Sequence, residues 1–490
     1  MHFCKKKSIM IYMEKSEYQT QEISEEVREK ERVQFEKMTK TPIPKLVVSL
    51  GIPTTLNMMV TSLYNLADTL FVSGLGDRAT GAVSVVLSLM SVIQAIGFTL
   101  GMGAGAIVSR LLGARRQKDA DITASSSFFS ALLVGVLITV LGISFLQPLM
   151  VFFGAVQETQ GTTTLQYASD YSFYILLSAP VMCASFVLNN LLRAQGKAWL
   201  SMIGLVTGAV INVGLDPLLI YGFSMGIHGA AIATMASQTV SFLLLLMMFL
   251  SGKSIARIRI KNVSFSPQIY AEIIGTGFPS FCRQMLASLC TLLLNRAVAG
   301  YDGGQAAVGV VQKVFMFAFS ISLGIGQGYQ PALGYNYSAK RYDRVKNAYL
   351  FTLFFSIALM MVFAVVCALL APVLMNSFLE SEQARNIGLL TLRLQCIGMP
   401  LLPVNFMAAV TYQVVGNKVA ASALSVSRQG LFYIPAILLL PLCWGVFGIE
   451  SAQFVSDCCA CLFALPFTFF FFKKLNGLIA ENPQNAEEKN

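Results

Sequence analysis

The stretch Gly101-Met102-Gly103-Ala104-Gly105 returns in the second half of the chain as Gly324-Ile325-Gly326-Gln327-Gly328. Further matches lie on both sides of it: Leu50-Gly51-Ile52-Pro53 with Thr276-Gly277-Phe278-Pro279, Pro180 with Pro400, Gly196 with Gly416, and Gly226-x-x-Gly229 with Gly445-x-x-Gly448. The offset falls steadily from 226 (positions 50 and 276) to 219 (positions 226 and 445), as short loop deletions in a duplicated unit would produce. Duplicated hydrophobic halves around a central site are typical of secondary transporters.

The composition indicates a polytopic membrane protein. The chain has 490 residues, of which 55% are hydrophobic and 12% are charged, whereas soluble domains carry roughly 25% charged residues. Twelve apolar runs reach the roughly 20 residues that cross a bilayer. They lie at residues 46–70, 82–108, 124–152, 168–192, 199–221, 229–250, 270–298, 305–330, 348–375, 386–413, 419–441 and 445–472. We therefore predict an all-α fold of twelve transmembrane helices in two six-helix lobes.

The positions of Lys and Arg predict the orientation, because short cytoplasmic loops retain positive charge. Loops on one side contribute little beyond Arg78 and Arg385. The loops after spans two, six and eight, on the other side, hold most of the charge: Arg110, Arg115, Arg116, Lys118, Lys253, Arg257, Arg259, Lys261, Lys340, Arg341, Arg344 and Lys346. Both termini are therefore expected in the cytoplasm. An even number of spans per half gives the halves the same orientation, so their pseudo-twofold axis should run along the membrane normal.

The predicted spans divide the chain into five parts. These are a charged cytoplasmic N-terminal tail (1–44), an N-lobe of spans one to six (45–252), a cytoplasmic inter-lobe loop (253–269), a C-lobe of spans seven to twelve (270–472) and a cytoplasmic C-terminal tail (473–490). The N-terminal tail contains no span and no signal-peptide core, and we assign it no function.

The sequence gives no sign of an enzyme, a cofactor or a nucleotide site. Gly252-Lys253-Ser254 looks like the end of a phosphate-binding loop, but the glycine needed five positions earlier is Met247. His2 and His228 are the only histidines, and every cysteine except Cys4 lies inside a predicted span, so a zinc or disulfide framework is not expected. The net charge of +10 is explained by the cytoplasmic loops and needs no nucleic acid.

Polar residues of the first span share one face. Asn57, Thr61, Asn65 and Asp68 recur at helical spacing. An ionisable group near the centre of a membrane helix costs at least about 2.5–3.5 kcal/mol, so such groups mark ion or substrate paths. This face should look into a cavity. The alternative is that Asp68 lies at the outer membrane boundary and only caps the helix end.

Two further spans add polar residues, and one of them adds a second carboxylate. Asn212 and Asp216 lie one turn apart in span five, and Pro217 follows directly, which weakens the helix beside the carboxylate. Thr234 and Gln238 share a face of span six.

The first half therefore contains a candidate cation-coupling site. Its expected members are Asp68, Tyr171, Asn189, Asn212, Asp216 and Thr234. A carboxylate withdrawn from water can take up and release a proton in the physiological range. Carboxylate, amide and hydroxyl oxygens together also suit a hard cation such as Na⁺, which Asp216 and Asn212 would hold. The sequence leaves both chemistries open.

The second half does not repeat this pattern. By the drifting offset, Asp68 corresponds to Asn295 and Asp216 to Ala436. Basic and amide residues occur instead, at Arg283-Gln284, Lys313 and Arg428-Gln429, and they either contact substrate or reach towards the cytoplasmic boundary. The residues expected to line a substrate cavity are Asn57, Thr61, Asn65, Gln238, Arg283, Gln284, Asn295 and Arg428.

The chain resembles the multidrug and toxic compound extrusion (MATE) family over about residues 42–470. The motifs that carry the resemblance are Asp68-Thr69-x-Phe71-Val72-x-Gly74-x-Gly76, Gly113-Ala114-Arg115-Arg116, Asn190-x-x-Arg193-Ala194-Gln195-Gly196, Asn212-x-x-x-Asp216-Pro217, Gln330-Pro331-x-Leu333-Gly334-Tyr335-Asn336-Tyr337 and Arg428-Gln429-Gly430. The Arg283-Gln284 and Arg428-Gln429-Gly430 pairs are similar to the MepA-like bacterial branch.

This resemblance implies a multidrug efflux antiporter of the cell membrane, in bacteria the inner membrane. Two lobes would alternate between inward- and outward-open states and exchange H⁺ or Na⁺ for an amphipathic, often cationic drug, without ATP and as a monomer. The family's cation-site positions fall on Asp68, Asn189, Asn212, Asp216 and Thr234, with Tyr171 beside them. The alternative is a flippase for lipid-linked oligosaccharides, which would use Arg283, Lys313 and Arg428 to bind pyrophosphate.

Overall fold

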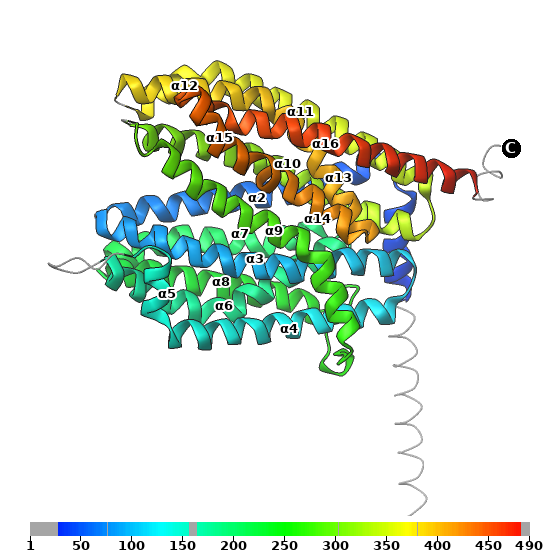
Figure 1. Ribbon diagram of the computed structural model, residues 1–490. Coiled ribbons are helices and arrows are strands. Elements are labelled where there is room, and N and C mark those ends of the chain that lie inside the picture. The colour runs from blue at the N-terminus through cyan, green and yellow to red at the C-terminus, as the bar shows by residue number, and fades with distance from the viewer. Residues whose placement is uncertain (1–27, 76, 156–163, 302, 380, 482–490) are drawn as a thin grey trace, which may run out of the picture.

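The computed structural model describes residues 28–75, 77–155, 164–301, 303–379 and 381–481, and the regular structure within them is helical (Figure 1). The first lobe contains α2 (Ile43–Ser73), α3 (Asp77–Gly113), α4 (Gln117–Ser144), α5 (Leu146–Phe152), α6 (Thr164–Ala194), α7 (Ala198–Pro217), the π-helix η1 (Leu218–Gly222) and α8 (Gly226–Leu250). A linker with the short 3₁₀ turn η2 (Ile260–Asn262) leads to the second lobe. That lobe contains α9 (Pro267–Val298), α10 (Gly304–Ser338), α11 (Tyr342–Phe378), α12 (Glu382–Gly398), η3 (Met399–Leu401), α13 (Leu402–Val415), α14 (Lys418–Val426), the π-helix η4 (Ser427–Tyr433), α15 (Ile434–Trp444) and α16 (Val446–Ala480).

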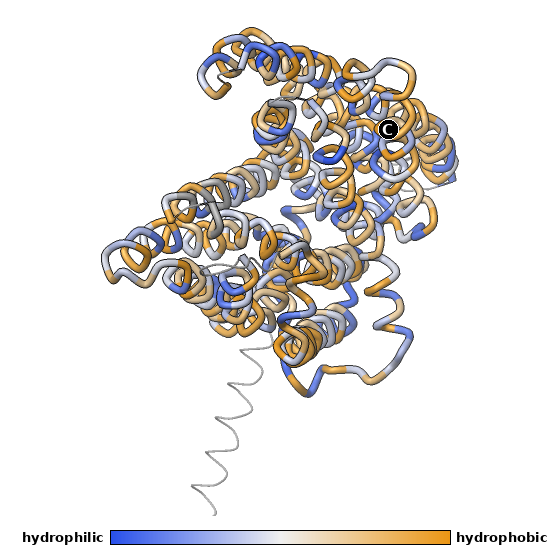
Figure 2. Tube along the Cα trace, turned by 60° about the vertical axis from the view of Figure 1, so that its left-hand side comes forward, coloured by the Kyte–Doolittle hydropathy of each residue, from blue (hydrophilic) through white to orange (hydrophobic). Residues whose placement is uncertain are grey.

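The predicted all-α membrane fold is confirmed. Eleven helical spans of the described chain are long and apolar enough to cross a membrane, and α9 accounts for the remaining predicted span. α9 has 32 residues, which gives about 48 Å at a rise of 1.5 Å per residue. Glu272, Arg283 and Arg296 make it more polar than the others. Leu369 on α11 and Leu442 on α15 are 74% and 82% exposed, as lipid-facing side chains should be. Hydrophobic residues are frequent along the helices of both lobes (Figure 2).

The third predicted span, 124–152, is not one continuous helix. α4 begins earlier, at Gln117, and ends at Ser144, and α5 restarts at Leu146 after Phe145 leaves the helical conformation. Pro148 explains the break, because proline cannot donate to the carbonyl four residues earlier and its ring clashes there. That carbonyl belongs to Ser144, the last residue of α4.

The two lobes pack together through glycines of the motifs that are duplicated in the two halves. A Cβ atom on Gly328 of α10 would lie 2.5 Å from the Cα of Gly51 on α2. A Cβ atom on Gly103 of α3 would lie 2.1 Å from the carbonyl oxygen of Ile273 on α9. The first span of each half thus meets the second span of the other half with backbones in contact, which only glycine permits. The glycine ladders therefore act in helix packing between the lobes.

The N-terminal helical residues 28–40 lie at the end of the molecule where α16 also ends (Figure 1). This end is called the termini side below. These helical residues touch both lobes. The Gln34 side chain donates to the carbonyl of Gln195 (2.8 Å) in the first lobe, and Asn336 of the second lobe donates to the carbonyl of Met38 (3.0 Å). The rest of the predicted tail, residues 1–27, lies outside the described residues.

Candidate functional site

Asp216 lies at the centre of a buried polar cluster in the first lobe. It is fully buried on α7, and its Oδ1 accepts a hydrogen bond from the Asn212 amide at 3.3 Å. The same amide lies 3.5 Å from the hydroxyl of Thr234 on α8. That hydroxyl in turn lies 3.4 Å from the hydroxyl of Tyr171 on α6. Three helices that are separated in sequence therefore contribute to one network.

Asp68 joins this network from α2. Its side chain is only 7% exposed, and its carboxylate accepts a hydrogen bond from Tyr171. The structure therefore brings five of the six predicted cation-coupling residues into one cluster, with Tyr171 and Thr234 between the two carboxylates. Asn189, the sixth, is held elsewhere: its amide donates to the backbone carbonyl (3.1 Å) and the hydroxyl (2.6 Å) of Ser201.

The cluster has free ligand capacity. Oδ1 of Asp68, Oδ2 of Asp216 and Oδ1 of Asn212 are buried and have no hydrogen-bond partner among the described residues. A buried carboxylate without a compensating donor or cation is costly. Oxygen atoms of this kind are the ligands that hard cations prefer, and a proton on a carboxylate would relieve the same imbalance. The residues therefore fit a bound cation, either Na⁺ or H⁺.

The backbone beside Asp216 is irregular for a reason visible in the sequence. α7 ends at Pro217, whose missing N–H removes the bond to the carbonyl of Val213, and the chain continues as the π-helix Leu218–Gly222. Short π segments inside membrane helices commonly occur at functional sites. The prediction that Pro217 disturbs the helix beside the carboxylate is therefore confirmed.

A cavity of about 770 Å³ separates the two lobes and extends from the middle of the molecule towards the end away from the termini side. Ser84 from the start of α3 and Gly309 from the start of α10 line it, whereas the opposite halves of the lobes meet at the glycine contacts. Six of the residues predicted for the two sites line its wall: Thr61, Asn189, Asn212, Gln238, Gln284 and Arg428.

Other predicted cavity residues lie elsewhere. Asn57 is buried, with neither side-chain polar atom hydrogen-bonded within the described chain. Arg283 stacks on the ring of Phe406 at 5.3 Å and borders a separate pocket of about 20 Å³. Asn295 is exposed at the far end of α9. Asn65 belongs to α2, but its side chain lies outside the described residues.

Tyr64 is a site residue that the sequence reasoning missed. It lines the cavity and lies close enough to interact electrostatically with both Asp68 and Asp216. It therefore stands between the buried carboxylates and the cavity. Its position four residues before Asp68, one helical turn away, was the available signal.

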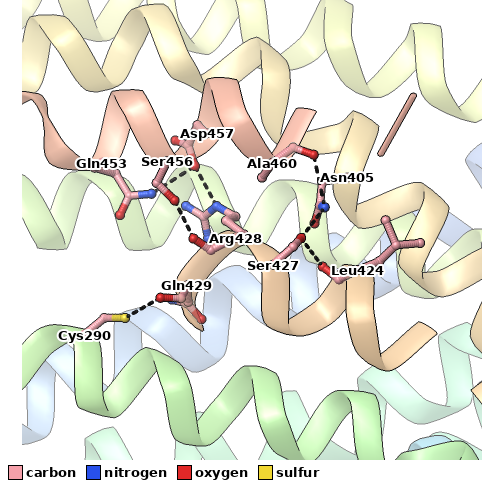
Figure 3. A network of polar contacts seen from close by, with 10 residues as sticks. All are labelled: Cys290, Asn405, Leu424, Ser427, Arg428, Gln429, Gln453, Ser456, Asp457 and Ala460. Atoms are coloured by element: carbon pink, nitrogen blue, oxygen red, sulfur yellow. Dashed lines mark hydrogen bonds and ion pairs between the residues drawn. The ribbon is translucent and has the colours of Figure 1, made fainter. Parts of the chain in front are cut away.

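The second lobe contains a different polar network, drawn in Figure 3. Arg428 on η4 donates from Nε to Oδ1 of Asp457 on α16 at 2.7 Å, and Gln453 donates to the same oxygen at 2.9 Å. Asp457 is fully buried, and the Arg428 guanidinium also packs on the rings of Phe315 (5.3 Å) and Phe319 (5.6 Å). Asp457 is therefore neutralised within the protein.

The irregular backbone of η4 is stabilised by side chains from its neighbours (Figure 3). Ser456 donates to the carbonyl of Arg428, and the Cys290 thiol donates to the carbonyl of Gln429 at 3.5 Å. Asn405 donates to the Ser427 hydroxyl at 3.1 Å. A broken membrane helix persists only when neighbouring groups satisfy its free polar atoms, so this network fixes the orientation of Arg428.

Two duplicated helical lobes, a cavity between them and a buried acidic cluster beside it define a secondary membrane transporter. Comparison with protein families matches residues 53–218 and 279–438, one segment in each half, to the MatE family. The two segments contain 326 residues (166 and 160), more than half of the chain, and the chain belongs to this family of transporters.

Individual relatives agree with this assignment. The chain is 27% identical over 440 residues to the multidrug export protein MepA of Staphylococcus saprophyticus, covering 89% of this chain and 96% of that one. It is 24% identical to MepA of Staphylococcus aureus over 439 residues, with the same coverage. An outward-facing multidrug resistance MATE transporter of the MOP superfamily matches with a TM-score of 0.84 at 25% identity, over 90% of this chain and 98% of that one.

Proposed function

We propose that this chain exports amphipathic drugs across the bacterial cell membrane in exchange for a cation bound at Asp68 and Asp216. The observation that carries the proposal is the group of three buried oxygens without hydrogen-bond partners, on Asp68, Asn212 and Asp216. They belong to helices that line the inter-lobe cavity, so a cation and a substrate would bind in neighbouring places. The MepA relatives, which are multidrug export proteins, support the substrate class.

The orientation follows from the basic loops. The termini side carries the clusters that include Arg116 and Lys340, and short cytoplasmic loops retain such charge. With that side in the cytoplasm, the glycine contacts close the cytoplasmic end and the cavity belongs to the outward-facing state. The five-part division at 45, 253, 270 and 473 follows the same topology and belongs to this proposal.

The cation would drive export by drawing two helices together. Asp68 is on α2 and Asp216 on α7, so a cation between them would pull α2 towards α7 and narrow the cavity. Pro53 inside α2 supplies a point at which that helix can bend. A membrane potential contributes about 2.3 kcal/mol per charge per 100 mV, which is roughly a fiftyfold gradient at 1.36 kcal/mol per tenfold. One cation per cycle is therefore sufficient for useful export.

The lipid-linked oligosaccharide flippase receives less support. It requires several free cations facing the cavity to bind pyrophosphate. Arg428 is neutralised by Asp457, and Arg283 stacks on Phe406 outside the cavity lining. Lys313 remains as a single free cation on the described wall.

Export of ethidium from liposomes under an imposed proton or sodium gradient tests the proposal. The wild-type protein should follow one of the gradients, which identifies the coupling ion. Absence of export under both gradients, from protein that is folded by size-exclusion chromatography, would contradict the function. Movement of a fluorescent polyprenyl-pyrophosphate analogue between the leaflets of the same liposomes would then support the flippase.

A further inference from the structure

Lys313 on α10 is the charge of the cavity wall that no acidic side chain neutralises. It lines the inter-lobe cavity with its side chain exposed, and it forms no ion pair within the described chain. Of the two buried acids on α16, Asp457 is already bound to Arg428, and Glu450 is outside the lining of this cavity. We propose that Lys313 determines substrate specificity by binding a single carboxylate on a zwitterionic, amphipathic substrate.

The depth of Lys313 argues against a simple surface charge. It lies eight residues from Ile321, the middle residue of α10, or about 12 Å at 1.5 Å per residue. The hydrocarbon core extends about 15 Å to either side of its midplane. A lysine at that depth is costly unless it faces water or a partner, and such residues are functional by default. The cavity is the polar space that this side chain reaches.

The other charge on the wall does not compete for an anion. Arg428 lines the same cavity, but Asp457 holds its Nε, and two phenylalanine rings cover the guanidinium. The pair is electrically neutral. Lys313 is therefore the one cation in the described lining of this cavity without an ion-pair partner, which matches one carboxylate and not a pyrophosphate.

The opposite wall has the opposite character. Asn212 and Tyr64 from the first lobe line the cavity, and the carboxylates of Asp216 and Asp68 lie behind them. The cavity is thus polarised, with negative charge behind one wall and a positive charge on the other. A molecule that carries both a cationic and an anionic group can orient along this axis, whereas a simple cation is repelled by Lys313.

This inference rests on the proposed function, because it assumes that the inter-lobe cavity holds substrate. Two dyes of the same skeleton separate the questions. Rhodamine 110 carries a free carboxylate, and rhodamine 123 is its methyl ester and only cationic. Export of both dyes from liposomes is measured for the wild type, for Lys313→Met, which keeps the length of the side chain, and for Lys313→Arg, which keeps the charge.

Lys313→Met should lower rhodamine 110 export at least about tenfold, the effect expected from one hydrogen bond between charged groups. Rhodamine 123 export should be unchanged or faster, and Lys313→Arg should retain most rhodamine 110 export. Lys474→Met, an exposed lysine of α16 outside the cavity lining, is the matched control and should change neither rate.

Equal losses for the two dyes in Lys313→Met, or unchanged rhodamine 110 export, would overturn the specificity role. Wild-type export of rhodamine 123 without rhodamine 110 would overturn it as well while leaving the exporter intact. Failure of the wild type to export either dye would instead contradict the proposed function.

Discussion

The two lobes descend from one unit, yet Asp457 of the second lobe has a partner of a kind that the buried acids of the first lobe lack. In the first lobe, Asp68 and Asp216 share a cluster of neutral groups and keep unpaired oxygens. In the second lobe, Asp457 is bound to Arg428 within the protein. A paired acid is fixed in one charge state, whereas an unpaired acid must obtain its cation from outside. The comparison supports our proposal that coupling belongs to the first lobe, because the Arg428–Asp457 pair of the second lobe is already neutral within the protein.

The largest expected effect is the loss of coupling in Asp216→Asn. The amide keeps the size and the hydrogen bond of the side chain but has no charge to bind a cation. Ethidium export driven by the coupling ion should fall at least about a hundredfold, because an interaction of 3 kcal/mol or more with a buried charge is lost. Liposome export is the measurement, and thermal unfolding of the variant should match the wild type. Retained gradient-driven export would remove Asp216 from the mechanism.

The second lobe should respond through stability. Arg428→Met leaves Asp457 buried without its partner, which should lower the free energy of unfolding by about 3–5 kcal/mol. The double variant Arg428→Met/Asp457→Leu should recover most of that loss, because both charges are removed. Thermal unfolding in detergent measures both variants. If the single and double variants are equally unstable, the ion pair is not the relevant interaction.

The contact between the lobes should be sensitive to single methyl groups. Gly328→Ala and Gly103→Ala place a Cβ atom against backbone of the other lobe, and such overpacking costs about 1–3 kcal/mol. Both variants should shift the protein away from the state closed on the termini side. Labelling of a cysteine engineered at Ser109, which packs against Gly334 of the other lobe, should increase. Gly309→Ala is the control, because nothing lies within 4 Å of its added Cβ atom. Equal labelling in all variants would show that the contact does not control access.

A smaller effect is expected from the two tyrosines near the carboxylates, Tyr171 and Tyr64. Tyr171→Phe removes a hydroxyl that bonds Asp68 and lies near Thr234, and one hydrogen bond contributes about 0.5–1.5 kcal/mol. The concentration of the coupling ion needed for half-maximal export should rise several-fold, with the maximal rate retained. Tyr64→Phe should give a weaker shift, because Tyr64 lies at the cavity edge of the cluster. A loss of maximal rate with an unchanged ion requirement would assign these residues another role.

Much of this arrangement was predictable from local sequence pattern. The lengths of the apolar runs predicted the spans. The one-turn spacing of Asn212 and Asp216 predicted that these two central residues of the first-lobe cluster lie together. Glu450, Gln453 and Asp457 of span twelve were possible partners for Arg428. The choice of Asp457 was not predictable, because it depends on how η4 and α16 pack against each other. Arg283 was expected in the cavity for its charge, but the neighbouring Phe406 holds it outside. Pro148 was a signal for the break before α5, but the hydropathy pattern, which is continuous there, predicted one span.

Competition between substrate and cation in purified protein tests the central claim most directly. Ethidium fluorescence reports binding to the cavity while the proton or sodium concentration is varied. Linkage requires that a cation which weakens ethidium binding is itself bound more weakly when ethidium is present. We predict that the cation displaces ethidium from the wild type and from the second-lobe double variant Arg428→Met/Asp457→Leu, but not from Asp216→Asn. If displacement persists in Asp216→Asn and disappears in the second-lobe double variant, coupling belongs to the second lobe and this account is contradicted.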